Sequence, residues 1–365
     1  MQLEQIVKQF QIYGDFVEGH PYGSGHINDT YKVSVNLSGT KVNYLLQRIN
    51  NAIFPNVEKL MENITRVTEH CAEKFCQMGY SDISRRCLTV VKTHSGGSFY
   101  FDHEGGYWRV YLFVEDATGF DVPETNEQIY QAGAAFARFQ SMLVDIPGEP
   151  LYEIIPGFHD GKKRLAAFEN ALEADRFNRA ANASAEIKYQ LDNAWMFDVL
   201  PDLVKKGAVP IRVTHNDTKI NNVLIDDKTA EGVCVIDLDT VMPGLSLYDF
   251  GDLVRTSTSP TQEDEKNIDI VGLRLDRFES LLNGFMSVGR DYLNKTEIEY
   301  LVFAGKLITM TIGMRFLTDY LSGDTYFKVH REGHNLDRCR TQYKLVQSIT
   351  DQQDELESLV ADTVR

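Results

Sequence analysis

The chain has 365 residues, and its 37 Lys and Arg against 53 Asp and Glu give a formal net charge of -16 at pH 7. An acidic chain has the wrong sign to follow a phosphate backbone, so the composition argues against nucleic acid as a partner. With about 150 residues per domain as a guide, the length predicts two domains or two lobes around a cleft.

The cysteine pattern and the apolar segments indicate the cellular compartment of the protein. The five cysteines form no C-x-x-C motif, so the sequence predicts neither a disulfide framework nor a zinc site. The N-terminus lacks the basic and apolar regions of a secretory signal. The apolar stretch from 300 to 321 contains Lys306, Arg315 and Asp319, which a membrane span tolerates poorly, so we expect a core helix there. A cytoplasmic protein without a membrane partner fits these features.

The N-terminal third is expected to form an antiparallel sheet of about five strands with one long helix. The expected elements are a short helix over 2–13, a glycine-bearing turn and strand over 22–33, a strand over 41–49, the long helix over 57–78, and strands over 88–91, 98–102 and 108–114.

The glycine-bearing turn has one possible chemical role. Two strands joined over such a turn can lay backbone N–H groups on phosphates without a side-chain clash. G-S-G also occurs in plain hairpins, so the turn predicts phosphate binding only together with the motif at 213–239 described below. At the end of the last strand, Phe113 and Val114 lead toward the second lobe, where an adenine could pair with exposed backbone.

The rest of the chain is mainly helical in pattern. We expect helices over 126–144, 160–174, 185–205, 275–288, 296–321 and from 342 onward, with Asp160 as an N-cap and with Trp195 and Phe197 in the core. The sequence therefore predicts an α+β protein with an N-terminal nucleotide-binding lobe, residues 1–115, and a C-terminal catalytic and substrate-binding helical lobe, residues 116–365.

The stretch 213–239 carries the strongest chemical signal. It contains H-x-D-x-x-x-x-N, in which Asp217 and Asn222 occupy the D and N positions, followed by I-D-x-D with Asp237 and Asp239. Phosphoryl transfer needs a carboxylate to accept a hydroxyl proton and oxygen ligands for magnesium. Asp217 is the predicted base, and Asn222 and Asp237 are the predicted metal ligands. Asn and Asp are also common in plain turns, but two such spacings that each run into a Val- and Ile-rich strand favour the functional interpretation.

The order of these parts resembles a known superfamily. The glycine turn, long helix, hinge, T-H-N-D-T-K-I-N-N, V-I-D-L-D-T-V-M-P-G and Y-D-F-G-D are similar to the aminoglycoside phosphotransferase and choline kinase superfamily, which has the two-lobed protein-kinase-like fold. With G-M-R-F-L-T-D-Y-L-S-G-D-T-Y-F, the chain looks specifically like the bacterial N-acetylhexosamine 1-kinases. That resemblance implies ATP, Mg²⁺ and transfer to the anomeric (C1) hydroxyl of N-acetylglucosamine or N-acetylgalactosamine.

The resemblance also implies site residues. It makes Asp217 the base, and it makes Asn222 and Asp237 the metal ligands. The residues expected at the nucleotide are Gly23, Ser24, Gly25, His26, Asn28, Thr30, Gln47, Phe113, Val114 and Lys219. The residues expected at the sugar are Asp217, Asp239, Arg315 and Tyr326.

One position departs from the kinase pattern. Where a phosphate-binding cation is expected on the third strand, Gln47 occupies the expected face and Arg48 follows one residue later. Alternation along a strand should point Arg48 away from the phosphates. Either Gln47 suffices, a bulge turns Arg48 inward, or metal and backbone alone meet the phosphate charge. Lys219 is a further candidate cation.

The residues alone leave more than one phosphoryl acceptor possible. Arg315 interrupts an apolar helix, and it either pairs with Asp319 one turn later or presents donors to a sugar together with Tyr326. The alternatives to a sugar kinase are a kinase of the same fold for another small alcohol, such as homoserine, choline or an aminoglycoside, and a nucleotide-binding module with little catalysis.

Overall fold

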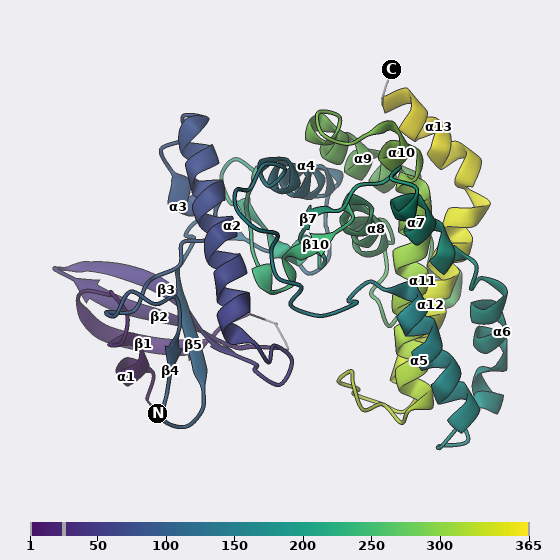
Figure 1. Cartoon of the computed structure of the whole chain (residues 1–365), viewed down its shortest axis with the longest axis horizontal. Helices are drawn as coiled ribbons and strands as arrows, with labels where there is room; N and C mark the ends of the chain where they lie inside the picture. Colours follow the sequence, from purple (N-terminus) through teal and green to yellow (C-terminus); the bar gives the residue numbers. More distant parts are fainter. Residues whose placement is uncertain (1, 24–26, 364–365) are drawn as a thin grey trace.

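The N-terminal part of the computed structural model is a twisted antiparallel sheet; the structure describes residues 2–23 and 27–363, so the predicted nucleotide residues Ser24, Gly25 and His26 lie outside the described residues. The strands are β1 (Asp15–Pro21), β2 (Asp29–Leu37), β3 (Thr40–Ile49), β4 (Tyr100–Phe101) and β5 (Tyr107–Leu112), in the spatial order β1-β2-β3-β5-β4. Figure 1 shows this sheet at one end of the molecule.

The two faces of the sheet have different neighbours because side chains alternate along each strand. On one face, Leu46 of β3 and Val110 of β5 join a small core with Ile6 and Phe10, which come from α1 (Leu3–Val7) and the residues after it. On the opposite face, Tyr111 packs into the larger core that contains the long helix α2 (Val57–Gln77). Gln47 and Arg109 lie directly opposite one another in the β3–β5 register, so they share this second face.

Two N-terminal expectations are wrong in detail. The first helix ends at Val7 rather than near residue 13, and residues 15–21 form an edge strand that the pattern did not predict. Residues 88–91 form no strand; they meet the sheet only through the single bridge between Val90 and Tyr111. This segment follows the short helix α3 (Ile83–Arg86), and the residue just before it, Cys87, forms a bridge to Val235 of the later hairpin.

The C-terminal part is mostly helical, as expected. Its helices are α4 (Asn126–Met142), α5 (Gly161–Ala174), α6 (Ser184–Asp192), α7 (Met196–Lys205), α8 (Ser246–Ser257), α9 (Leu275–Gly289), α10 (Lys295–Glu299), α11 (Leu301–Leu321), α12 (His334–Asp351) and α13 (Gln353–Thr363). Asp160 caps α5 by accepting a hydrogen bond from the Lys163 backbone N–H at 3.0 Å, which confirms its predicted role. The helix expected over 185–205 is instead broken into α6 and α7, and Trp195 at the break is 57% exposed rather than buried.

Short strands hold the segment that carries the chemical motifs. β7 (Arg212–Thr214) pairs with β10 (Met242–Gly244), and β8 (Val223–Asp226) lies between β6 (Ala117–Thr118) and β9 (Gly232–Val235). In Figure 1 this region lies between α2 and the helices α5, α11 and α12. The division of the chain at residue 115 stays a prediction.

Helix α11 is the apolar helix noted in the sequence. By length and composition it could cross a membrane, but 78% of its most apolar window is buried inside the protein. It packs against α8, α12 and α5 (Figure 1), and Lys306 donates to the Gln353 side chain at 2.6 Å. The helix is therefore the core element that the charged residues predicted.

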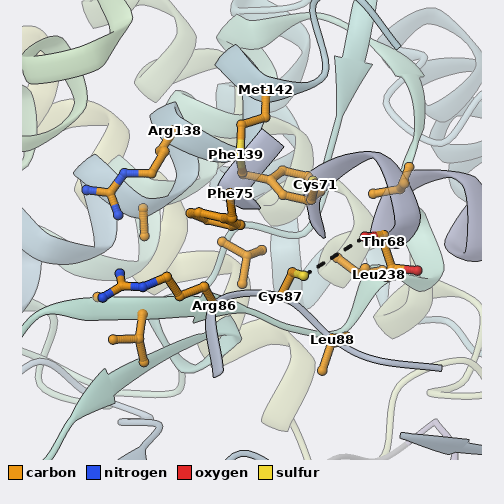
Figure 2. Close-up of a pocket in the computed structure, with 15 residues that line it drawn as sticks. Thr68, Cys71, Phe75, Arg86, Cys87, Leu88, Arg138, Phe139, Met142 and Leu238 are labelled. Carbon is orange, nitrogen blue, oxygen red and sulfur yellow. Dashed lines mark hydrogen bonds between the residues drawn. The ribbon is translucent and has the colours of Figure 1, made fainter. Parts of the chain in front are cut away.

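An apolar pocket of about 20 Å³ lies between α2, α4 and the β9 hairpin (Figure 2). Arg86 and Arg138 line it, but their guanidinium groups lie within 3.3 and 4.0 Å of the Glu231 carboxylate. Burial raises the pKa of the Cys71 and Cys87 thiols, so both pack there as neutral side chains. Leu238 reaches this pocket from the motif at 237–239, so the pocket anchors that motif rather than serving as a polar site.

Candidate active site

The turn that carries Asp217 is held by a buried aspartate on α8. The Asp249 carboxylate accepts backbone N–H groups from His215 at 3.0 Å and from Asn216 at 2.7 Å. Asn216 has a left-handed φ of 66°, a conformation that non-glycine residues adopt at a cost, so these bonds stabilise an unfavourable turn. Asp249 belongs to the Y-D-F-G-D motif, so this motif supports the turn that carries Asp217.

His215 joins the turn to the end of β9. Its Nδ1 accepts the Asp217 backbone N–H at 3.3 Å, so its proton lies on Nε2, which donates to the Ile236 carbonyl at 2.8 Å. The ring is fully buried and packs edge-on against Phe136 with centroids 5.2 Å apart. His215 therefore fixes the distance between Asp217 and the residue after Ile236, which is Asp237.

Asp217 lies beside the other residues of its motif. Its carboxylate is 3.2 Å from the Lys219 ammonium, and the Asn222 amide donates to the Asp217 carbonyl at 2.8 Å and to its carboxylate at 3.4 Å. Burial alone would raise the pKa of Asp217, but the charge of the nearby Lys219 ammonium and its hydrogen bond outweigh it and leave that pKa below its ordinary value. The carboxylate is therefore ionised at neutral pH and can accept a proton.

Asp237 is the least constrained acid of the group. It has a left-handed φ of 59°, and among the described residues its carboxylate has no hydrogen bond or ion pair. Loss of hydration, together with the nearby Asp239 and Asp217 carboxylates, raises the pKa of Asp237 to about 6. An unpartnered carboxylate in a negative field is a suitable ligand for a cation.

The donor set fits magnesium. Because the Asn222 N–H groups face Asp217, its carbonyl oxygen is left for another partner, and with Asp237 it offers two hard oxygen donors. Magnesium in phosphoryl-transfer sites is held by one or two protein groups plus water and phosphates. Over residues 2–23 and 27–363, no group of three or more His, Cys, Asp or Glu is placed to hold a metal.

Asp239 is engaged by a residue that the sequence interpretation did not single out. Its carboxylate forms a buried ion pair with both terminal nitrogens of Arg109 on β5, the Nη2 to Oδ2 bond being 3.0 Å, and it also accepts the Asn28 amide at 2.7 Å. The Arg109 Nε donates to Gln47 at 2.9 Å, and Gln47 donates onward to Thr30 at 3.0 Å. Asn28, Thr30, Gln47 and Asp239, all predicted site residues, therefore belong to one network centred on Arg109.

A buried cation, Arg109, lies on the neighbouring strand β5, directly opposite Gln47. The β2–β3–β5 register runs without a shift past Gln47 and Arg48, so no bulge turns Arg48 inward. Arg48 is exposed, and its Nε would lie 3.0 Å from a Cβ placed on Gly106, on the face opposite Arg109. The alternation rule could have located Arg109 only if the pairing of β3 with β5 had been known.

The predicted nucleotide residues at the sheet edge lie beside the glycine turn. The Phe113 ring is 5.3 Å from the Tyr22 ring and 3.8 Å from the Lys32 ammonium. Tyr22 precedes Gly23, which has a φ of 80° that favours glycine. Val114 is 5% exposed and belongs to the larger core, so only its backbone is available to a ligand.

Arg315 does not pair with Asp319. Asp319 instead accepts backbone N–H groups from Thr325, Tyr326 and Phe327 at 2.8 to 2.9 Å. Among described residues, no carboxylate lies within ion-pair distance of Arg315; its guanidinium lies 5.5 to 5.8 Å from the rings of Phe158, Tyr326 and Phe327. Its Nη2 is 3.5 Å from the Tyr326 hydroxyl, so the two predicted sugar residues are brought together.

His159 connects this aromatic cluster to the Asp217 turn. Its Nε2 lies 2.9 Å from the Asn216 carbonyl, and its ring stacks on Tyr248 at 4.9 Å. Burial lowers the pKa of His159 to about 4, and both Asp217 and Arg315 act on it electrostatically. His159 therefore lies close to both Asp217 and Arg315.

A cavity of about 430 Å³ adjoins this region. Asn216, Tyr248, His159 and Thr311 line it, and Asp217 is not among the described residues that do. The cavity therefore reaches the rear of the turn rather than the predicted base.

Comparison with known proteins agrees with this architecture. The sequence model of the phosphotransferase enzyme family matches residues 18–273. An aminoglycoside phosphotransferase from Alicyclobacillus acidocaldarius subsp. acidocaldarius is 13% identical, with a TM-score of 0.57 over 100% of this chain and 95% of that chain. A microcompartment-associated aminopropanol kinase is 13% identical, with a TM-score of 0.57 over 97% of each chain. The Plasmodium vivax ethanolamine kinase is 15% identical, with a TM-score of 0.55 over 89% of this chain and 82% of its own. The predicted α+β, kinase-like fold is confirmed.

Proposed function

Since the chain belongs to the phosphotransferase enzyme family, we propose that it is an ATP- and Mg²⁺-dependent kinase that phosphorylates the anomeric hydroxyl of N-acetylhexosamines. The products are the sugar 1-phosphate and ADP. N-Acetylglucosamine and N-acetylgalactosamine are the acceptors that the sequence resemblance implies.

The transfer step is assigned to Asp217. Its ionised carboxylate accepts the proton of the C1 hydroxyl as that oxygen bonds to the γ-phosphorus of ATP, and the bond from that phosphorus to the β,γ-bridging oxygen breaks. Lys219, 3.2 Å from Asp217, keeps the carboxylate ionised and is a candidate partner for the γ-phosphate. Asn222 and Asp237 would hold Mg²⁺, which neutralises phosphate charge when bound.

Arg315 is the observation that carries the choice of acceptor. A half-buried guanidinium without a carboxylate partner among the described residues repels a cationic amine and offers N–H donors to neutral hydroxyl or amide oxygens. The surrounding rings of Phe158, Tyr326 and Phe327 suit the apolar face of a sugar ring. This favours a neutral N-acetylhexosamine over choline, ethanolamine or an aminoglycoside.

A kinase for another small alcohol is the second candidate. Its support is the fold shared with an ethanolamine kinase and an aminopropanol kinase, whose names indicate amino alcohol substrates. A nucleotide-binding module with little catalysis is disfavoured by the ionised Asp217 carboxylate and by the Asp237 carboxylate, which has no hydrogen bond or ion pair among the described residues.

A panel of acceptors tests the proposal. ADP release is measured with ATP and Mg²⁺ for N-acetylhexosamines, unmodified hexoses and amino alcohols, including homoserine. The proposal expects the highest kcat/KM with an N-acetylhexosamine. A preference for an amino alcohol would assign the second function, and no turnover with any acceptor would favour the binding module.

A further inference from the structure

Arg109 is the most completely buried cation of the chain that the structure describes, at 1% exposure. Its side chain and that of Asp239 are 2% and 4% exposed, so their ion pair is shielded from water. Burying such a pair is costly unless its hydrogen bonds are satisfied, and removing one partner leaves an uncompensated charge in the protein interior. The cost of burying this ion pair indicates that it has a structural or a chemical role.

The donors of Arg109 are already committed. Nη1 and Nη2 bind the two oxygens of Asp239, and Nε binds Gln47 at 2.9 Å. Since Arg109 is an obligate donor, the carbonyl end of the Gln47 amide must face it, which leaves the Gln47 N–H for Thr30. Arg109 in this arrangement therefore holds protein groups, and at 2% exposure its side chain is closed to a phosphate.

The network connects two segments that are far apart in the sequence, the start of β2 and the residues around Asp239. Asn28 and Thr30 lie at the start of β2, directly after the glycine turn, and Asn28 donates to Asp239 at 2.7 Å. Asp239 lies two residues after Asp237, and Leu238 between them is anchored in the apolar pocket of Figure 2. The position of Asp237 relative to the start of β2 is thus set through Asp239.

We propose that Arg109, Asp239, Asn28 and Gln47 form a positioning bridge that replaces the cation expected on β3, and that it aligns the Asp237 carboxylate with the strand that follows the glycine turn. Arg109 acts on the metal and the phosphates through Asp239 and not by contact. The consequence for nucleotide binding rests on the proposed function; the structural consequence does not.

Lysine cannot replace arginine in this bridge. The planar guanidinium serves both oxygens of Asp239 and the Gln47 carbonyl at once, whereas a single ammonium is a point donor on a flexible stem. In ADP affinity and in hydrogen exchange, Arg109→Lys should therefore resemble Arg109→Met rather than the parent protein.

The test compares Arg109→Met, Arg109→Lys, Asp239→Asn and the double variant Arg109→Met/Asp239→Leu, which leaves no unpaired buried charge. The control is Arg212→Met, because Arg212 forms a buried two-bond pair with Glu297 at 2.8 Å outside the network. ADP binding is measured by calorimetry with and without Mg²⁺, and hydrogen exchange is followed at residues 236–241.

The bridge predicts that each variant except the control loses about 10- to 100-fold of the Mg²⁺-dependent gain in ADP affinity, as observed when groups that orient metal ligands are removed. ADP affinity without Mg²⁺ should change less than about 3-fold, and exchange at residues 236–241 should accelerate only in the bridge variants.

Two results would overturn the bridge. A loss of Mg²⁺-free ADP affinity in Arg109→Met but not in Asp239→Asn would make Arg109 a direct phosphate clamp. Unchanged exchange at 236–241 in the double variant would show that the pair positions nothing. If the parent protein binds no Mg²⁺–ADP, the proposed function fails, while the exchange measurement still decides on the bridge.

Discussion

Two buried aspartates do the same physical task in different parts of the molecule. Asp249 on α8 accepts backbone N–H groups of the turn that carries Asp217, and Asp319 on α11 accepts those of the loop that carries Tyr326. At the first site the acid fixes the predicted base. At the second it leaves Arg315, one turn away, without an acid. A helical acid near an arginine thus does not imply an ion pair, because backbone donors compete for its oxygens.

The largest effect is expected at the turn itself. Asp217→Asn keeps the size and the hydrogen-bonding capacity of the side chain but cannot accept the hydroxyl proton, so kcat should fall about 10²- to 10⁴-fold. Steady-state kinetics measure this, and thermal unfolding within about 2 °C of the parent confirms that the fold is intact. A rate within a factor of three of the parent would remove Asp217 from the role of base.

Removal of the two supporting acids compares the regions directly. Asp249→Ala leaves two buried N–H groups without an acceptor and should cost about 2–4 kcal/mol in the free energy of unfolding. Asp319→Ala should cost a similar amount, but its kinetic effect should be on the acceptor KM, whereas Asp249→Ala should lower kcat. Urea unfolding and kinetics separate the two. Identical kinetic effects would mean that the two loops serve the same step.

Arg315→Met tests the acceptor side with a smaller effect. Loss of charged hydrogen bonds to a sugar should raise the acceptor KM about 10- to 100-fold while the KM for ATP stays within about 2-fold. Arg290→Met is the control, at an exposed arginine that bonds the Met286 carbonyl at 2.9 Å and has no part in the Arg315 cluster. An increase in the ATP KM instead would place Arg315 at the nucleotide.

The smallest effect concerns pH. His159 has a pKa of about 4 in the folded chain because it is buried, while an unfolded histidine titrates near 6.5, so the unfolded chain takes up the proton first as pH falls. The contribution of His159 to the free energy of unfolding is therefore fully present above about pH 6.5. About 2 kcal/mol of it should be lost as the pH falls to 4. His159→Gln, which can still donate to Asn216, should remove that part of the slope in urea unfolding. An unchanged slope would contradict the prediction.

Local patterns predicted what is encoded locally. The spacing around Asp217, Asn222 and Asp237, the helix α2 and the Asp160 cap follow from neighbouring residues, and the family match agrees with the phosphotransferase interpretation. Arg109 could not be found that way, because its partner Asp239 is 130 residues away in the chain. The prediction that Trp195 lies in the core was wrong for a similar reason. Hydrophobicity alone does not show that the helix breaks at this residue.

The most direct test of the sugar kinase account uses one pair of acceptors. N-Acetylglucosamine and its 1-O-methyl glycoside differ only at the anomeric oxygen, and phosphorus NMR of each reaction with ATP and Mg²⁺ identifies the product. The account predicts a sugar 1-phosphate from the free sugar and no product from the glycoside. Phosphorylation of the glycoside would place the transferred group on another hydroxyl and contradict the assignment of the C1 proton to Asp217.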